Sequence, residues 1–182
     1  MYCDFAAFIL QYIQGGDGNM NRFCNCIEDR IVYPILIKNH GRNYLTLYYY
    51  TEYSDSVIHN NKKRILYFQS DEYMRAFCME NDLQTKNDTV EYNFDAPIEN
   101  PIDFTRVLDN WNLLNTIAKT FKMFFEGDRK KYTSLYDYLF RLNMPSEPIS
   151  ATYRLVCEKD YKNILKVFRK KDRFLKLFEL YQ

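Results

Sequence analysis

The sequence has little net charge and few glycines. Its 182 residues carry a formal net charge of +1, with 5 glycines and no internal repeat or low-complexity segment. A dedicated nucleic-acid binder gains much of its affinity by neutralising phosphates, so this charge balance argues against that class of protein. The apolar fraction of 47% is sufficient for a sizeable core.

Residues suited to catalysis are scarce. The two histidines, His40 and His59, fall in predicted polar loops, and neither a GxSxG elbow nor a GxxxxGK[ST] phosphate loop is present. Asp109 and Asp137 would meet if their predicted helices pack together, but exposed helix carboxylates are the simpler interpretation. We therefore expect no enzymatic activity.

Signals for export and membrane insertion are also missing from the N-terminal residues. No Lys or Arg precedes Arg22, no small-residue cleavage site follows, and the apolar stretch from Phe5 to Ile13 is too short to span a bilayer. The five cysteines are odd in number, so an oxidising compartment would leave one unpaired. We expect a cytoplasmic protein.

Cys24 and Cys26 form the one close cysteine pair. Structural zinc sites need two such pairs, or a pair plus histidines at set spacing. A site made of Cys3, Cys24, Cys26 and a histidine is conceivable, but free cysteines in a reduced cytosol are the simpler interpretation. We expect no metal or other cofactor.

Aromatic residues are abundant instead, with 17 Tyr and 14 Phe. Tyrosine buries its ring but needs a partner for its hydroxyl, which predicts a core with a polar rim. The length favours one domain over residues 1–182, with residues 1–28 as a loosely attached helix and loop. That helix is expected from Tyr2 to Gln14.

The strongest helical signal runs from Asn100 to Pro145 and predicts two amphipathic helices joined at Gly127. Asn100 suits the N-cap, Pro101 the first helical position and Asp103 the third. Gly127 can adopt positive φ and end the first helix. Apolar residues then recur at spacings of three and four along both helices, with Trp111 on the core face.

The remaining patterns predict strands over 29–38, 43–53, 64–69 and 89–94, and helices over 71–81 and from Asp160 onward. Pro34 places the first strand at an edge or at a bulge, and Asn39–Arg42 forms a hairpin turn. Ala151–Cys157 is a further short strand. We predict an α+β fold in which a mostly antiparallel sheet of about four strands packs against several helices, including a long central helical hairpin.

The second strand separates its side chains into a tyrosine face and a leucine face, and the leucine face is expected to meet the core. Tyr48, Tyr50 and Tyr53 then become candidate contact anchors, since aromatic residues dominate interface hot spots. The alternative is a sheet surface covered by a helix.

Charge is distributed unevenly along the chain. Residues 51–110 hold 12 acidic and 6 basic residues, whereas residues 153–182 hold 9 basic and 4 acidic ones. A solvated surface explains this asymmetry, and an acidic face for a basic partner is the functional alternative. The candidate acidic contacts are Asp71, Glu72, Asp82, Asp88, Glu91, Asp95, Glu99 and Asp103.

A motif spans Leu108–Phe121 and Phe124–Ser146. It has an acidic residue and a tryptophan on a long helix, a Phe-x-Gly turn with a following Lys, a Tyr-Asp dipeptide, and then Asn, an apolar residue and Pro. The residues are Leu108, Asp109, Trp111, Asn112, Phe125, Gly127, Lys130, Tyr136, Asp137, Leu139, Phe140, Asn143 and Pro145. This pattern resembles immunity proteins of bacterial contact-dependent growth inhibition and related polymorphic toxin systems.

The resemblance implies a small cytosolic protein that binds the C-terminal domain of a cognate toxin, often a nuclease, in a 1:1 complex and blocks its active site. It implies neither a membrane nor a nucleic-acid partner. Two alternatives stay open: a nuclease or toxin that uses Lys130 and Lys131, and a regulatory module whose basic C-terminal region binds nucleic acid or an acidic protein.

Overall fold

The computed structural model describes residues 27–51, 54–95, 103–144 and 158–181. The predicted helix at Tyr2–Gln14, the Cys24–Cys26 pair, the Asn100–Pro101 helix start and the strand at Ala151–Cys157 lie outside these residues. The strands are β1 (Ile31–Asn39), β2 (Arg42–Tyr50), β3 (Asp55–Val57), β4 (Ile65–Tyr67), β5 (Gln84–Thr85), β6 (Val90–Asn93) and β7 (Phe178–Leu180). The helices are η3 (Glu28–Arg30), α2 (Asp71–Glu80), α3 (Phe104–Thr120), η4 (Glu126–Asp128), η5 (Lys130–Tyr132), α4 (Thr133–Leu142), α5 (Glu158–Phe168) and α6 (Asp172–Leu175).

The strands form a mixed five-stranded sheet and a separate parallel pair, β4 and β7, so the α+β class is confirmed. In the larger sheet β1 pairs antiparallel with β2, whereas β5 and β6 pair parallel with β1. The prediction of a mostly antiparallel sheet is therefore wrong for β5 and β6, which are parallel to β1. The intervening α2 carries the chain back to the same end of the sheet, which is what parallel pairing requires.

Pro34 lies inside the sheet, on its central strand. The Leu47 carbonyl accepts from Ile58, so it faces away from β1, and the Pro34–Leu47 pair lacks direct hydrogen bonds. The missing N–H of Pro34 therefore falls on the side of β5 and β6, in the gap between their pairings at Val32 and Ile35. The predicted edge position is therefore wrong. The physical reason for that prediction still applies, because Pro34 sits where the sheet needs no N–H donor and no ladder hydrogen bond is lost.

The hairpin turn between β1 and β2 is confirmed. Asn39 pairs with Arg42, and the two residues between them have positive φ, +51° at His40 and +67° at Gly41. This is the backbone geometry of a two-residue hairpin turn whose twist matches the strands. The turn fixes which β2 side chain lies opposite each β1 side chain.

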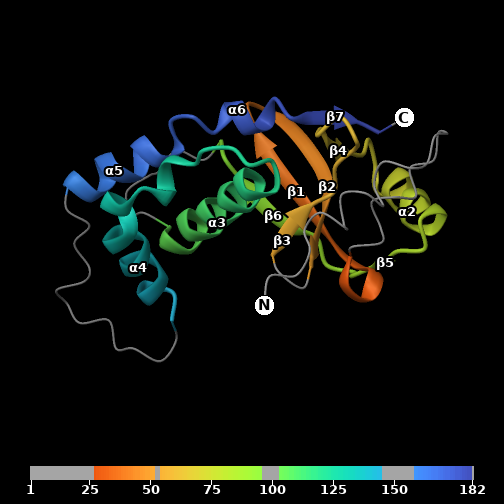
Figure 1. Ribbon diagram of the computed structural model, residues 1–182, viewed down its shortest axis with the longest axis horizontal. Coiled ribbons are helices and arrows are strands. Elements are labelled where there is room, and N and C mark those ends of the chain that lie inside the picture. The colour runs from red at the N-terminus through yellow and green to blue at the C-terminus, as the bar shows by residue number, and fades with distance from the viewer. Residues whose placement is uncertain (1–26, 52–53, 96–102, 145–157, 182) are drawn as a thin grey trace, which may run out of the picture.

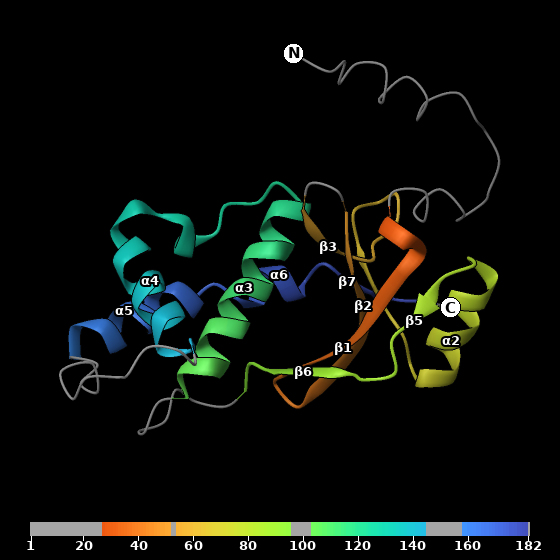
Figure 2. The same ribbon diagram turned by 90° about the horizontal axis from the view of Figure 1, so that it is seen from below.

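Both faces of the large sheet are buried, which corrects the expectation of a single core face. Leu47 and Tyr49 pack against Met74 and Phe77 of α2 on one side. On the other side α3 crosses the sheet from β6, where Asn110 Nδ2 donates to the Asn93 carbonyl at 3.1 Å, towards β3. Figures 1 and 2 show the sheet between α2 on one side and α3, with α4 beyond it, on the other.

The predicted long helical hairpin is not formed. The first helix starts at Phe104 with Asp103 as its N-cap and ends at Thr120, seven residues before Gly127. Lys122 has a φ of +52°, and the Met123 N–H bonds to the Ala118 carbonyl at 2.8 Å, which defines a Schellman ending. The chain then passes through η4 and η5 before the short α4 begins.

Gly127 has a different role from the predicted helix stop. It is buried in η4, where an added Cβ would lie 2.4 Å from a Phe125 ring carbon and 2.7 Å from Trp111. Trp111 also contacts the rings of Tyr132 and Tyr136. Trp111, Phe125, Gly127 and Tyr136 of the pattern thus pack together, and Tyr136 donates to Asn112 Oδ1 at 2.9 Å.

No helix among the described residues is both long and apolar enough to cross a membrane.

Candidate functional site

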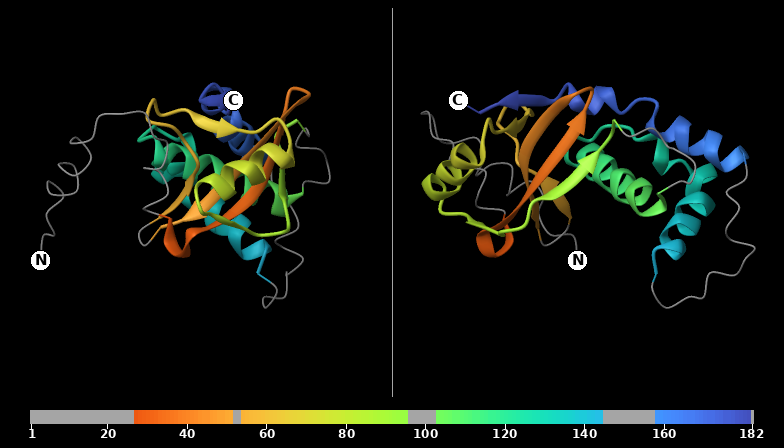
Figure 3. Two further views of the ribbon diagram at one scale, coloured as in Figure 1. Left: turned by 90° about the vertical axis from the view of Figure 1, so that its right-hand side faces the viewer. Right: turned by 180° about the vertical axis from the view of Figure 1, so that it is seen from behind.

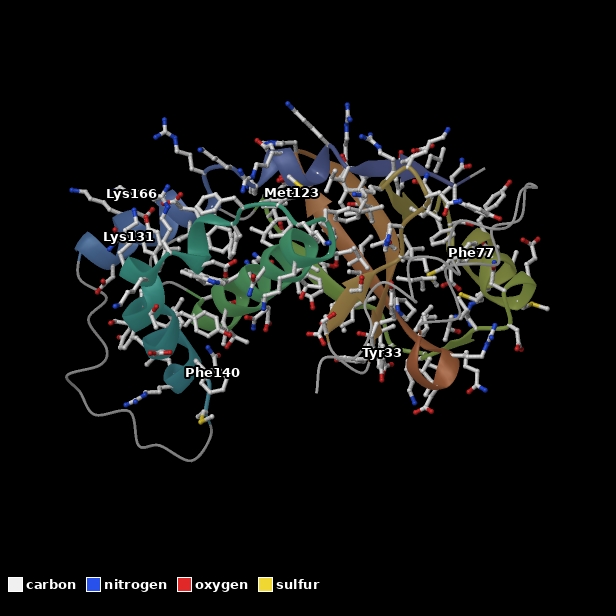
Figure 4. All side chains as sticks on the ribbon, viewed as in Figure 1. Tyr33, Phe77, Met123, Lys131, Phe140 and Lys166 are labelled. Atoms are coloured by element: carbon white, nitrogen blue, oxygen red, sulfur yellow. The ribbon has the colours of Figure 1, made fainter. Side chains whose placement is uncertain are left out.

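A partly exposed group of tyrosines lies at the end of the β1–β2 ladder away from the hairpin turn. Tyr33 on β1 is paired with Tyr48 on β2, and Tyr50 follows on the same face two residues later. Tyr50, the last residue of β2, is 45% exposed, whereas Tyr49 before it is buried. Figure 4 labels Tyr33 at the lower end of the sheet.

The tyrosine rings support one another edge to face. The Tyr50 ring centroid lies 5.3 Å from that of Tyr33 and 5.4 Å from that of Tyr48, at interplanar angles of 84° and 82°. Edge-to-face pairs of this kind are favourable because the positive ring edge meets the negative face. The exposed Tyr50 ring is therefore held in place before any partner arrives.

Two carboxylates act on tyrosines of this sheet face. Asp55, the first residue of β3, lies opposite Tyr50 in the strand pairing. The charge of Asp109 on α3 acts on Tyr92 of β6, which is paired with Ile37. Tyr48 hydrogen-bonds through its side chain to Asp55 and to Thr116 of α3. Neither Asp55 nor Asp109 forms an ion pair with another described residue.

The two charged side chains of this group, Asp55 and Asp109, are both carboxylates, and their charges raise the pKa of neighbouring tyrosines. Burial raises the pKa of Tyr48 far above its usual range, and the hydrogen bond and charge of Asp55 raise it further. Burial, followed by the charge of Asp109, raises the pKa of Tyr92 on β6 to about 12, with smaller contributions from Tyr50 and Asp55. The pKa of Asp109 is itself raised, by burial and then by the charge of Asp103.

We name this group the tyrosine–carboxylate surface. Its members are Tyr33, Tyr48, Tyr50, Tyr92, Asp55 and Asp109. Three strands and α3 contribute to it in addition to β1, so it exists only in the folded chain. An aromatic surface with uncompensated negative charge is suited to a partner that brings a cation.

The sequence pattern identified part of this surface. Tyr48 and Tyr50 were predicted as contact anchors and lie in it, whereas Tyr53 lies outside the described residues. Tyr33 was missed, although the register set by the hairpin turn places it opposite Tyr48. Asp55 was missed because its segment was predicted as a loop.

The predicted acidic contacts do not gather in one place. Asp71 and Glu72 lie in the first turn of α2, on the side of the sheet opposite α3. Asp82 pairs with Arg30 at 3.4 Å, and Glu91 pairs with Lys38 at 2.7 Å. Asp88 is exposed on the approach to β6, which runs along the near edge of the sheet in the right-hand view of Figure 3.

Two further predicted contacts hold the chain together. Asp95 accepts from the backbone N–H groups of His40 and Gly41 in the hairpin turn, and these bonds lower its pKa although burial opposes the change. Asp103 caps α3 by accepting from the Arg106 N–H at 3.0 Å. Glu99 lies outside the described residues.

No group of His, Cys, Asp and Glu side chains among the described residues has the arrangement of a metal site. His59 Nδ1 lies 2.9 Å from the Val57 carbonyl, and its ring packs on Phe121. Cys78 of α2 is buried on the face of that helix that packs into the core. The four other cysteines lie outside the described residues.

Comparisons with known proteins bear on the fold. No protein-family model and no curated protein sequence matches this chain. Among solved structures, the chain is similar to the C-terminal domain of SatS, determined in complex with bromine, with a TM-score of 0.51 and 14% identity over 84% of this chain and 95% of that one. At this identity the similarity concerns the fold alone.

Proposed function

We propose that this chain is an immunity protein that binds a cognate toxin domain and blocks its active site, without catalysis or a cofactor of its own. The observation that carries the proposal is the tyrosine–carboxylate surface. It combines pre-arranged aromatic rings with two carboxylates that have no cation among the described residues. Its expected partner is the basic substrate-binding surface of a nuclease.

The physical argument concerns both affinity and rate. Interface hot spots are enriched in Tyr, Trp and Arg that become fully desolvated on binding. Tyr50 is exposed yet fixed by two ring contacts, so it loses little side-chain entropy when covered. A negative surface also speeds the approach of a basic partner and favours it over neutral ones.

The resemblance to immunity proteins supports the same proposal from another part of the chain. Trp111 and Gly127 pack against each other, and Trp111 is 2% exposed. Because these residues are buried, the resemblance supports a shared scaffold and not a shared contact surface. The toxin-binding residues are expected on the sheet, where the sequence pattern carries no family signal.

The test is binding to the toxin domain encoded immediately upstream. The full chain is expected to form a 1:1 complex with that domain and to rescue cells that express it. Tyr50→Ala should weaken the complex by roughly 30-fold, since a hot-spot truncation costs about 2 kcal/mol. The double variant Asp55→Asn/Asp109→Asn removes both charges at nearly constant shape and should also weaken binding.

Tyr73→Ala is the matched control, because Tyr73 is 55% exposed on α2, across the sheet from the surface. It should leave affinity unchanged. An upstream domain that does not bind, or cells that are not rescued, would refute the immunity function. Equal losses in the Tyr73 and Tyr50 variants would refute only the assignment of the surface.

A second candidate is a regulatory module that binds nucleic acid or an acidic protein through the basic C-terminal region. The observation that favours it is a group of cations on α5 and the following turn, Lys166, Arg169 and Lys170, that have no ion pair with another described residue. Binding to random DNA that weakens steeply with salt, and is lost in Lys166→Ala/Lys170→Ala, would support this candidate.

A further inference from the structure

A cavity of about 510 Å³ opens beside the hairpin turn, at the end of the β1–β2 ladder away from Tyr33, Tyr48 and Tyr50. It lies between the hairpin turn and the segment that holds α6 and β7, and Figure 1 shows α6 beside the hairpin end of β1 and β2. Ligand cavities for small molecules commonly range from about 300 to 1,000 Å³. The proposed toxin contact does not use this region, so its role is a separate question.

The wall of the cavity contains a buried acceptor without a partner. Asn39 is 3% exposed, and its Nδ2 donates to Asp172 Oδ1 at 3.4 Å. Its Oδ1 is buried and has no hydrogen-bond partner. His40 Nε2 lies 3.3 Å from the same Asp172 oxygen. A buried carbonyl oxygen without a donor is costly, so a ligand that donates to Asn39 would be stabilised here.

Aromatic rings form the apolar part of the cavity. The Tyr44 centroid lies 5.2 Å from that of Tyr67 and 4.8 Å from that of Phe178. These rings belong to both sheets, because Tyr44 lies on β2 while Tyr67 and Phe178 lie on the paired strands β4 and β7. A flat heteroaromatic ring can pack on such a group, and stacking of this kind contributes about 1–3 kcal/mol per base.

Cations complete the lining. Arg42 and Lys176 are both exposed and line the cavity. Neither makes a hydrogen bond, ion pair or ring contact through its side chain with another described residue. A guanidinium and an ammonium together are well suited to a phosphate, which accepts charge-assisted hydrogen bonds from both.

We propose that this cavity binds a nucleotide. The base packs on Tyr44, Tyr67 and Phe178, an exocyclic amine of the base donates to Asn39 Oδ1, and the phosphate binds Arg42 and Lys176. An aromatic wall, a buried acceptor and exposed cations in one cavity match the three parts of this ligand. The same chemistry is offered by a free mononucleotide and by a nucleotide within a single strand.

Calorimetric titration of the full chain with AMP tests the proposal. Saturable binding is expected, and Arg42→Ala/Lys176→Ala should weaken it roughly tenfold or more, because two charge-assisted contacts are lost. Lys86→Ala is the matched control, since Lys86 is exposed and does not line the cavity, and it should bind AMP as the natural chain does. Purine riboside monophosphate, which lacks the amine, should bind more weakly than AMP.

A short adenine oligonucleotide distinguishes the two sources. If the oligonucleotide binds more tightly than AMP, and Arg42→Ala/Lys176→Ala abolishes that binding, the ligand of the cavity is a nucleotide within a strand. If the oligonucleotide binds more weakly than AMP, the ligand is a free nucleotide. Both results support the proposal. Inorganic phosphate that binds as tightly as AMP would overturn it, because the base would then contribute nothing. Absence of AMP and oligonucleotide binding, or equal binding by the double variant, would also overturn it.

Discussion

A Cβ atom on Gly127 would lie 2.7 Å from Cε2 of Trp111, closer than side chains pack. Phe125, which is 1% exposed, would be even nearer, at 2.4 Å. Gly127→Ala should therefore lower the free energy of unfolding by about 1–3 kcal/mol through overpacking. Urea denaturation followed by circular dichroism measures this loss.

The cause of that loss can be separated from backbone effects. Phe125→Leu removes the ring atoms that the new methyl group meets, so the double variant Phe125→Leu/Gly127→Ala should be more stable than the sum of the two single losses predicts. Additive losses would contradict the steric explanation. If Gly127→Ala left the free energy of unfolding unchanged, that result would contradict the close packing of Gly127 against Phe125 and Trp111.

The cap of α3 gives a second prediction. Asp103 accepts from the Arg106 N–H at 3.0 Å, so Asp103→Ala should cost about 1 kcal/mol of stability. Asp103→Asn keeps a capping oxygen and should cost less. Thermal unfolding of the three chains measures the order, and equal stability of all three would show that the cap contributes nothing.

Strong periodic patterns predicted the main elements, and weak ones were missed for physical reasons. β1, β2 and their turn were found because alternation and positive-φ residues carry local information. β3, β5 and β7 hold two or three residues each, too few for a period to show. Their existence depends on tertiary contacts, such as the bond from Ile65 N–H to the Leu177 carbonyl.

The helical hairpin shows how a correct apolar stripe can suggest the wrong backbone. Phe121 and Phe125 continue the spacing of α3, yet the helix has already ended at Thr120. Phe125 reaches Trp111 from an extended segment, since Lys122 reverses the chain in a Schellman ending. Burial of the rings was predictable, but the conformation that buries them was not.

The candidate surface was predictable only in part for a related reason. Tyr48 and Tyr50 could be assigned to one face from alternation alone. Asp55 and Asp109 join them through pairing of β3 and packing of α3, which are long-range consequences of the fold. Charge counts along the chain favoured a different acidic segment, whose carboxylates the structure places on separate elements.

Tyr92 gives a prediction for alkaline pH. Burial and the charge of Asp109 raise its pKa from 10.0 to about 12, so the folded chain holds this proton where the unfolded chain loses it. The resulting stability is fully present below pH 10.0 and is lost as pH rises towards about 12. Two pKa units correspond to about 3 kcal/mol, and solvent screening at this partly exposed phenol should reduce the loss to about 2 kcal/mol.

Urea denaturation at a series of alkaline pH values measures this slope. Tyr92→Phe removes this titrating group and should make the slope shallower while leaving stability below pH 10.0 nearly unchanged. Tyr48 and Tyr50, whose pKa values are also raised, account for the slope that remains. Tyr73→Phe, at an exposed position on α2, is the matched control and should keep the full slope. An unaltered slope in Tyr92→Phe would show that the phenol does not titrate as the structure indicates.

The charge of the tyrosine–carboxylate surface predicts how a toxin complex responds to salt. If Asp55 and Asp109 attract a basic partner, the association rate should fall as ionic strength rises from about 0.1 M to about 1 M, where the screening length shrinks from about 10 Å to about 3 Å. Asp55→Asn/Asp109→Asn should flatten that dependence, whereas Tyr50→Ala should mainly raise the dissociation rate. Stopped-flow mixing separates the two rates.

Asp88→Asn is the charge control for that experiment, because Asp88 is exposed but lies outside the surface. It removes one negative charge from the same chain and should leave the salt dependence of association close to that of the natural protein. If Asp88→Asn flattened the dependence as much as the double variant does, net charge rather than a local surface would steer the partner. The tyrosines would then act without the carboxylates, and binding would remain sensitive to Tyr50→Ala alone.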